Sequence, residues 1–498
     1  MGVSEQVVPV YWAPDLFPDW NVNPGVLVSV SDAYPTKMKT LRGYQMTGNI
    51  GITAAVATYG TPLYARIFRD TSDVGHMVYG TTTRLMNPQD FGFGAAFVDR
   101  SKGGAAYTTA TDWSFCMWGN KIYAFSKANT PQVSTISAGA MGTFADLGGT
   151  PPKASLCAVN MGFVMLGDTN DGVDDLADRW WCSAWQDPAD YVPSMATESA
   201  YGYCRDTNGP LRALEPQRDT FVFYKADSIY VLNYVGPSNV FSTRCVAHSV
   251  GCAAPHGVAV FGDDHYFLHA TGIYKFDGQA VTPLAGEKVS RFIKETFSSN
   301  GALYSAHATV DEHEGVIIWY LRNNTSTTAA FTNALAYNIF TGQLGWIITP
   351  WASYTMTGAV RASTADCIQW DGGYGQNSAT KLHIAGVGHA SGNFSLAFAS
   401  VNGDTSTFKT GHMGSDTKFA QSIRVTPRAI RLSGLSSATD YNRKSMWDAS
   451  PTSTTMTADS AARALYSLQS NRWHQIQFSA TDIDLAGLTI EGVAAGHE

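Results

Sequence analysis

The stretch DDHYFLHATGIYKFDG, residues 263–278, decides the fold class. Two short runs rich in aromatic and aliphatic residues, YFL and IYKF, flank a turn-like Ala-Thr-Gly, and Asp-Gly follows the second run. Aromatic and branched residues favour strands, whereas glycine and aspartate favour tight turns. The pattern therefore predicts an antiparallel β-hairpin with one buried face.

The same pattern recurs at three other places along the chain. GNKIYAFSK begins at Gly119, ADSIYVLNY at Ala226 and TNALAYNIFTGQLGW at Thr332, and a strand-like run precedes each of them. The segment GFVMLGDTNDGVDDLADRWWCSAW, from Gly162, fills the widest gap between these hairpins. A weak all-β repeat of roughly 45–60 residues predicts the blades of a β-propeller. Unrelated hairpins in a β-sandwich are the alternative that this pattern leaves open.

Two segments have the character of short helices between the strands. GEKVSRFIKETF, residues 286–297, places Val289, Phe292 and Ile293 on one helical face. TADSAARALYSL, residues 457–468, is rich in alanine and offers Thr457 or Asp459 as a helix N-cap. We therefore expect an all-β chain with short interspersed helices.

Composition suggests where the chain is divided. Residues 400–456 are polar and rich in serine and threonine, whereas the last segment, from Arg472, again alternates like strands. We expect an N-terminal extended segment at residues 1–45 and a propeller body at 46–400. Residues 401–498 would then form a β-rich C-terminal extension, made of a polar insertion and terminal strands.

Overall composition excludes several classes of protein. The 498 residues are 44% hydrophobic, which excludes general disorder, and only 15% charged, too few for a helical bundle. The net charge of −8 gives no global positive field for gripping nucleic acid. We expect a strand-rich globular protein with much of its surface covered by partner subunits.

The cysteines and the apolar runs indicate a cytoplasmic site of synthesis. No CxxC occurs, and the odd number of scattered cysteines predicts free, buried thiols. They are Cys116, Cys157, Cys182, Cys204, Cys245, Cys252 and Cys367. The N-terminus has no signal-peptide pattern, and apolar runs such as 315–321 have only the length of strands. We expect no membrane span.

The usual signatures of enzymes and cofactor sites are absent from the sequence. No GxSxG, GxxxxGK[ST] or HExxH occurs, so we expect neither catalysis nor a cofactor. DTNDGVDD, residues 168–175, resembles a calcium loop in composition, but Gly172 and Arg179 occupy the wrong positions of an EF-hand register. We expect a solvated loop there, with a weak cation site as the alternative.

A group of charged residues precedes the strand-like run GVIIWYL. The group consists of His307, Asp311, His313 and Glu314. A metal site would need these side chains to converge with further ligands that the sequence does not identify. We therefore expect a turn with solvated charges and no metal.

One basic stretch, SIRVTPRAIRL, stands out at residues 422–432. In a strand, Ile423 and Val425 would share one face and Arg424 and Arg428 the other, with Arg431 nearby. Pro427 predicts an edge strand or an interrupted one. A polar outer face is the simplest interpretation of Arg424, Arg428 and Arg431, and contact with a partner subunit or with DNA is the alternative.

Several ordered segments resemble the β-propeller tail proteins of short-tailed bacteriophages, the tail nozzle or hub that one branch names the packaged-DNA stabilisation protein. The strongest match is SVGCAAPHGVAVFGDDHYFLHATGIYKFDGQAVTPLAGEKVSRFI, residues 249–293. The other matches are VVPVYWAPDLFPDW from Val7, YGTTTRLMNPQDF from Tyr79, DRWWCSAWQDPADYVPS from Asp178 and TNALAYNIFTGQLGW from Thr332. The resemblance covers roughly residues 5–350 and does not extend to the polar region after residue 400.

This resemblance implies a fold, an assembly and a place in the virion. The propeller would have six blades, and a homohexamer would form the distal ring of the tail, made and assembled in the host cytoplasm. A tail adaptor ring protein would bind above it, and tail fibre, spike or needle proteins would be further partners. The ring would enclose the exit channel of the packaged double-stranded DNA, without sequence specificity, and retain the genome until ejection.

Two functions from other classes stay open. A glycan-degrading propeller enzyme would need paired carboxylates, or the tyrosine nucleophile of sialidases. The sequence has no S-x-D-x-G-x-T-W repeat of the sialidase kind. A receptor-binding propeller would need an exposed aromatic platform, and residues 400–456 are polar instead.

Overall fold

The structure is a computed structural model, in which strands dominate. It describes residues 3–13, 26–88, 97–297, 302–322, 331–348, 355–361, 381–390, 393–400, 405–414, 420–445, 450–459, 463–469 and 471–494. Within these ranges the helical elements are α1 (Val56–Tyr59), α2 (Glu287–Phe297) and the 3₁₀ turns η2 (Lys102–Gly104) and η3 (Ala302–Ser305). The helix predicted at residues 286–297 is therefore confirmed as α2, with Ile293 fully buried. No helix among the described residues has the length and apolar character to cross a membrane.

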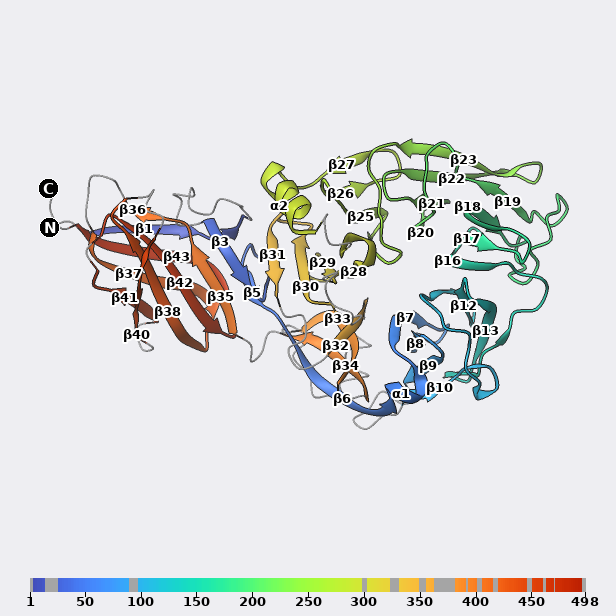
Figure 1. Cartoon of the computed structure of the whole chain (residues 1–498), viewed down its shortest axis with the longest axis horizontal. Helices are drawn as coiled ribbons and strands as arrows, with labels where there is room; N and C mark the ends of the chain where they lie inside the picture. The colour runs from blue at the N-terminus through green and yellow to red at the C-terminus, as the bar shows by residue number, and fades with distance from the viewer. Residues whose placement is uncertain are drawn as a thin grey trace.

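Five consecutive sheets form the blades of a propeller-like ring (Figure 1). Each blade is an antiparallel meander whose strands are neighbours in sequence, as the recurring hairpins predict. Blade 1 contains β7 (Pro62–Arg69), β8 (Gly75–Thr81), β9 (Leu85–Pro88) and β10 (Phe97–Asp99); blade 2 contains β11 (Ser114–Trp118), β12 (Lys121–Ser126), β13 (Asn129–Ser137), β14 (Ala140–Met141) and β15 (Ala145–Asp146). Blade 3 contains β16 (Lys153–Asn160), β17 (Phe163–Asn170), β18 (Asp175–Cys182) and β19 (Ala200–Tyr203). Blade 4 contains β20 (Ala213–Gln217), β21 (Thr220–Tyr224), β22 (Ile229–Gly236) and β23 (Val240–Ala247); blade 5 contains β24 (Val258–Phe261), β25 (Asp264–His269), β26 (Gly272–Phe276) and β27 (Val281–Pro283).

Two further sheets close the ring between blades 5 and 1. One comprises β28 (His307–Asp311), β29 (Val316–Leu321), β30 (Asn333–Asn338) and β31 (Leu344–Ile347); the other comprises β32 (Thr355–Arg361), β33 (Lys381–Ala390), β34 (Asn393–Ser400) and β6 (Gln45–Ala55). The strands β7, β11, β16, β20, β24, β28 and β32 contact one another in a closed cycle. The six blades implied by the resemblance are not supported. Five sheets contain only strands that follow one another in sequence. The two closing sheets also include strands from the N-terminal part of the chain, because β31 pairs with β2 and β34 pairs with β6.

The chain ends form a second unit, the terminal sandwich, on one side of the ring (Figure 1). Its first sheet contains β1 (Val3–Pro9), β43 (Asp484–Ala494), β37 (Ala420–Arg431), β41 (Ala464–Ser467), β40 (Thr457–Asp459), β4 (Ala33–Pro35) and β5 (Leu41–Gly43). Its second contains β2 (Tyr11–Trp12), β3 (Val26–Ser31), β35 (Thr405–Thr410), β36 (Met413–Gly414), β42 (Trp473–Thr481), β38 (Gly434–Arg443) and β39 (Thr452–Thr455). Buried residues of both sheets, among them Leu488 and Phe478, belong to one hydrophobic core.

The structure also corrects the helix prediction near the C-terminus. The helix predicted at residues 457–468 is wrong: β40 and β41 pair there, and Leu465 of β41 is fully buried beside β37. Residues 460–462 of that segment lie outside the described residues, as do residues 401–404 at the predicted domain boundary. The N-terminal segment pairs with the C-terminal strands, since Val3 of β1 lies opposite Val493 of β43.

A continuous sheet joins the ring to the terminal sandwich. Strand β31 pairs with β2 through Leu344 and Trp12, so one sheet runs from β28 through β31, β2 and β3 to β39. Trp12, Phe292 of α2 and Trp346 meet edge to face or tilted, with ring centroids 5.5–6.1 Å apart. At Gly345 a Cβ atom would lie 2.4 Å from the carbonyl oxygen of Ala33, so glycine permits the close approach of the two backbones. We call this contact region the junction.

Candidate functional site

The axis of the ring holds a cluster of polar and aromatic side chains from distant blades, which we call the axial cluster. Tyr64 of β7 stacks on the ring of His256, with centroids 3.5 Å apart. Both carboxylate oxygens of Asp112 lie 3.0 Å from Nε2 of His256. His307 of β28 contacts both rings edge to face, at centroid distances of 5.7 Å from Tyr64 and 5.0 Å from His256.

These contacts cross the ring, and the axis is therefore filled. Tyr64 and Asp112 belong to blade 1 and to the segment before blade 2, whereas His256 directly precedes blade 5. Arg66, also on β7, donates a hydrogen bond of 3.1 Å to the carbonyl oxygen of Phe115. Side chains from both sides of the ring therefore touch one another at this point.

Burial controls the ionisation of the axial cluster. It raises the pKa of the Tyr64 hydroxyl to about 12, so this group stays neutral. Burial also lowers the pKa of His307 well below its ordinary value, and the charges of His256 and Arg322 lower it further. The pKa of Glu215 is raised by burial, an effect that Arg66 and His256 partly oppose.

The axial cluster contains an acid–base pair in direct contact, His256 with Asp112. The nearby thiol of Cys116 has a pKa well above its ordinary value because it is buried beside Cys157, so it is not an activated nucleophile. Across the described residues, no three His, Cys, Asp or Glu side chains are arranged to hold a metal ion.

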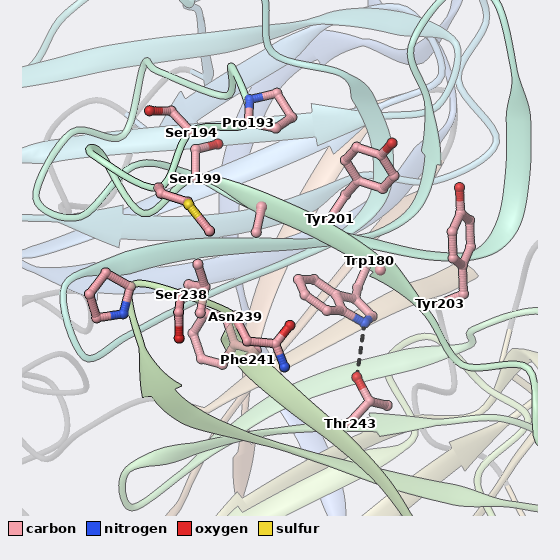
Figure 2. A pocket seen from close by; sticks show the side chains of 15 residues that line it. Trp180, Pro193, Ser194, Ser199, Tyr201, Tyr203, Ser238, Asn239, Phe241 and Thr243 are labelled. Atoms are coloured by element: carbon pink, nitrogen blue, oxygen red, sulfur yellow. Dashed lines mark hydrogen bonds between the residues drawn. The ribbon is translucent and has the colours of Figure 1, made fainter.

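A second site is an open groove of about 510 Å³ between blades 3 and 4 (Figure 2). One wall is β19, with Tyr201 and Tyr203, and the other is the β22–β23 turn, with Ser238 and Asn239. Trp180 of β18 lies between the walls, and its indole nitrogen donates a hydrogen bond of 3.2 Å to Oγ1 of Thr243. The groove thus combines aromatic rings with uncharged hydrogen-bonding groups.

The three predicted arginines lie on β37 in the terminal sandwich, far in sequence from both sites. Ile423 and Val425 are buried, as the alternation predicts, while Arg424 pairs with Glu491 at 3.2 Å and lies over the ring of Tyr466. Arg428 donates a hydrogen bond of 2.7 Å from Nε to Oγ1 of Thr489, and Arg431 is exposed. Binding of DNA or of a partner by these arginines stays a prediction.

Pro427 sits where its missing N–H is tolerated. Pairing between β37 and β41 covers only Ile423 to Val425, whereas pairing with β43 continues past Pro427, which lies opposite Leu488. Among the described residues, no strand pairs with Pro427 on the side of β37 where β41 lies, as expected for proline in a sheet.

The acidic loop predicted as a solvated turn is occupied by the protein's own cations. Lys127 bridges Asp168 and Asp175 at 2.5 and 2.6 Å, and Arg179 pairs with Asp171 at 2.8 Å. These pairs place a positive charge beside three carboxylates of the loop, and the weak cation site stays an untested alternative.

The predicted group around His307 is divided between two places. Asp311 accepts backbone hydrogen bonds from His313 and Glu314, which caps the turn before β29. His307 instead joins the axial cluster. Sequence reasoning missed this cluster, because its members come from segments that no local pattern connects. It also missed the groove, for which the alternating AYGY of β19 was the available signal.

Comparisons with known proteins leave the family resemblance of residues 5–350 as a hypothesis. The chain matches no protein-family model, and no curated protein is significantly similar to it in sequence.

Proposed function

We propose that this protein is a non-catalytic structural component of a short-tailed bacteriophage virion. In this proposal six copies form the nozzle or hub ring at the distal end of the tail. The ring binds the tail adaptor ring protein above it, and tail fibre, spike or needle proteins are its other partners. It retains the packaged double-stranded DNA until ejection.

The observation that carries the structural role is the junction between ring and terminal sandwich. A hinge between two units needs a place where few contacts cross, with backbone hydrogen bonds that can break cheaply. Here a single sheet continues from β28 to β39, and the packed rings of Trp12, Phe292 and Trp346 brace it. Such a frame transmits force between its two ends, which a tail part under the pressure of packaged DNA requires.

In the proposed oligomer, the DNA path lies between the copies. Because the axial cluster fills the middle of the single ring, the channel has to run between copies around the symmetry axis of the oligomer. A net charge of −8 per chain suits a conduit of this kind, since each additional phosphate contact would add grip that slows sliding.

The absence of catalysis is part of the proposal. The acid–base pair at the axis, His256 with Asp112, is covered by the stacked ring of Tyr64, and the neighbouring thiol is protonated. A hydrolase would instead need an accessible nucleophile or activated water beside such a pair.

Electron microscopy of the purified protein, alone and mixed with tail adaptor protein, tests the proposal. We expect closed, rotationally symmetric particles, with six copies as the expected number, and mass photometry should give the matching mass. Particles carrying the protein should show it at the distal end of the tail.

Two results would contradict the proposal. One is a protein that stays a 53.6 kDa monomer under all of these conditions. The other is turnover of a bacterial surface glycan that is abolished by Asp112→Asn, because this would make the axial cluster a reaction centre.

A further inference from the structure

We propose that β23 of one copy of this chain pairs with β1 of the next copy, so that the sheets of blade 4 and of the terminal sandwich continue across the contact. This inference rests on the proposed ring of six copies and identifies the surfaces that join them. Four features carry it: the length of two strand edges, their positions in the molecule, the charges on them and the apolar side chains beside them.

Strand β23 is the longest of the outermost blade strands that the structure describes. It has eight residues, whereas β10 and β27 have three each, β14 and β15 two each and β19 four. Its inner edge pairs with β22, and in the described part of the chain no strand pairs with its outer edge. Long open edges are uncommon in proteins, because their unpaired backbone groups bind the strands of other chains. β23 is therefore suited to accept an added strand.

Strand β1 is the corresponding long edge of the terminal sandwich. It has seven residues, against four in β39 and three each in β40 and β4. β1 pairs with β43 along its whole length, from Val3 to Pro9, and with no other strand among the described residues. The open edges of β1 and β23 therefore match in length to within one residue.

The two edges lie at opposite ends of the molecule. In Figure 1, β1 belongs to the sandwich at one end of the long axis, whereas β23 lies among the blades towards the other end. Edge strand β6 is longer, but it runs between the sandwich and blade 1 (Figure 1). A contact between different surfaces of successive copies is heterologous, and it closes into a ring when the rotation between copies allows this. Pairing of β1 with β23 is a contact of this kind.

The single charges on the two strands are opposite in sign. Arg244 is the only charged residue of β23 and is exposed, and Glu5 is the only charged residue of β1. The register within one copy places Glu5 opposite Glu491, and directly opposed like charges are unfavourable. Antiparallel addition with Arg244 opposite Glu5 supplies a positive charge at this position and defines the register between the copies.

This register also brings exposed apolar side chains into the contact. Val7 of β1 is 49% exposed and comes to lie opposite Ser242, which is exposed as well. Pro9, also exposed, comes to lie opposite Val240, and Val235 at the neighbouring end of β22 is 50% exposed. Burial of these side chains adds a hydrophobic contribution to the backbone hydrogen bonds of the added strand.

Disulfide cross-linking of the full chain tests the proposed register. Val7→Cys and Ser242→Cys are combined in a Cys245→Ser background, because Cys245 is a partly exposed native thiol on β23. Mild oxidation should give a ladder of covalently joined chains on a denaturing gel, and either new cysteine alone should leave monomers. A ladder requires that two different surfaces of successive copies meet, because a two-fold symmetric contact ends at a dimer.

Charge reversal tests the same contact without a covalent bond. Arg244→Glu and Glu5→Arg should each raise the concentration needed for association about tenfold or more in mass photometry, and the double variant should restore association. Lys121→Glu reverses an exposed charge on blade 2 and is the control, which should associate as the unmodified protein does. Thermal melting followed by circular dichroism shows whether each variant is folded.

The outcomes separate this inference from the proposed function. Closed particles that give no ladder, or that both single charge reversals leave unchanged, overturn the contact between β1 and β23 while the tail ring stands. A ladder of open chains without closed particles supports the contact and contradicts the closed ring. A protein that stays monomeric and gives no ladder contradicts both.

Discussion

The ring and the terminal sandwich are both built from antiparallel strands, but their strands are paired in opposite ways. In the blades, partners are close in sequence, as for Leu166 and Trp181 in blade 3. In the sandwich, partners come from the two ends of the chain, as for Val3 and Val493. The difference teaches that one sheet type can arise from local signals while the other depends on a fold that is already present.

The closed ring is the structure on which pairing in the sandwich depends. Gln45 of β6 lies opposite Ser400 of β34, so closing the ring brings the two chain segments that enter the sandwich together. The entropy lost on joining distant segments falls once their ends are already close. Ring closure therefore lowers the entropy lost when the sandwich strands pair, just as the short turns lower it for the strands of each blade.

Deleting residues 1–44 should produce the largest difference in stability between the ring and the sandwich. It removes β1 to β5 and leaves β43, β35 and β31 without these partners. Hydrogen exchange should then show loss of protection throughout the sandwich, while the five self-contained blades keep protected amides. Uniform loss of protection in both regions would show that the blades do not fold on local pairing.

Trp12→Ala should weaken the link between the two regions. Trp12 is 6% exposed and packs on Phe292 and Trp346 at the junction. Removal of a buried tryptophan costs about 3–5 kcal/mol, so chemical denaturation should show a large loss and a split into two transitions. Trp185→Ala, an exposed tryptophan in blade 3, serves as the control and should leave a single transition. A single transition in Trp12→Ala would argue that the continuous sheet alone couples the regions.

Acid should weaken the ring before the sandwich. His265 in blade 5 is fully buried, and burial lowers its pKa to about 4. A histidine with a lowered folded pKa favours folding above the unfolded value, and this contribution is lost as pH falls from about 6.5 towards 4. Near pH 4 the loss from His265 amounts to roughly 3 kcal/mol, and His307 adds to it in the same direction.

Hydrogen exchange at pH 7 and pH 4 measures this effect in each region. His265→Gln should reduce the pH dependence of amide protection in the ring. His248→Gln, at an exposed position, should leave it unchanged. Earlier loss of protection in the sandwich would contradict the assignment of the acid sensitivity to the buried histidines of the ring.

Replacing Arg424, Arg428 and Arg431 together with Gln should have the smallest effect on stability. Exposed ion pairs such as that of Arg424 with Glu491 contribute little, so the melting temperature should stay within about 1 °C. If this face binds a partner, particle assembly should fall, and if it lines the channel, DNA retention or ejection should change. Sequence-specific DNA binding that persists at about 200 mM salt would contradict a sliding channel.

The sequence predicts the blades well because their signals are local. The run at residues 263–278 becomes the hairpin of β25 and β26, with the turn at Gly272, and 286–297 becomes α2. The sequence could not predict how the ring closes, because closure depends on pairing between β6 and the distant strand β34 at residues 393–400. The six blades implied by the family resemblance are therefore not supported.

The sandwich and the axial cluster show which features depend on contacts between distant parts of the chain. Alanine-rich residues 457–468 have helix propensity, but pairing of Leu465 with Val425 on β37 overrides it. The axial cluster joins Tyr64, Asp112, His256 and His307, whose contacts exist only when the ring is closed. Burial of Ile423 and Val425 agrees with the predicted alternation, but the sequence could not show that Glu491 pairs with Arg424.

The position of β6 has a consequence for biosynthesis. At roughly 5–20 residues per second, a ribosome that has made Ala55 needs on the order of tens of seconds to reach Ser400. During this time β6 lacks its partner strand β34, and β1 remains unpaired longer still, until β43 has been made. Nascent chains thus carry unpaired strand edges while the blades fold in turn, so slower elongation or high expression should favour aggregation of incomplete chains. A soluble fusion partner at the N-terminus should reduce this aggregation, because it lies next to β1 while β1 is unpaired.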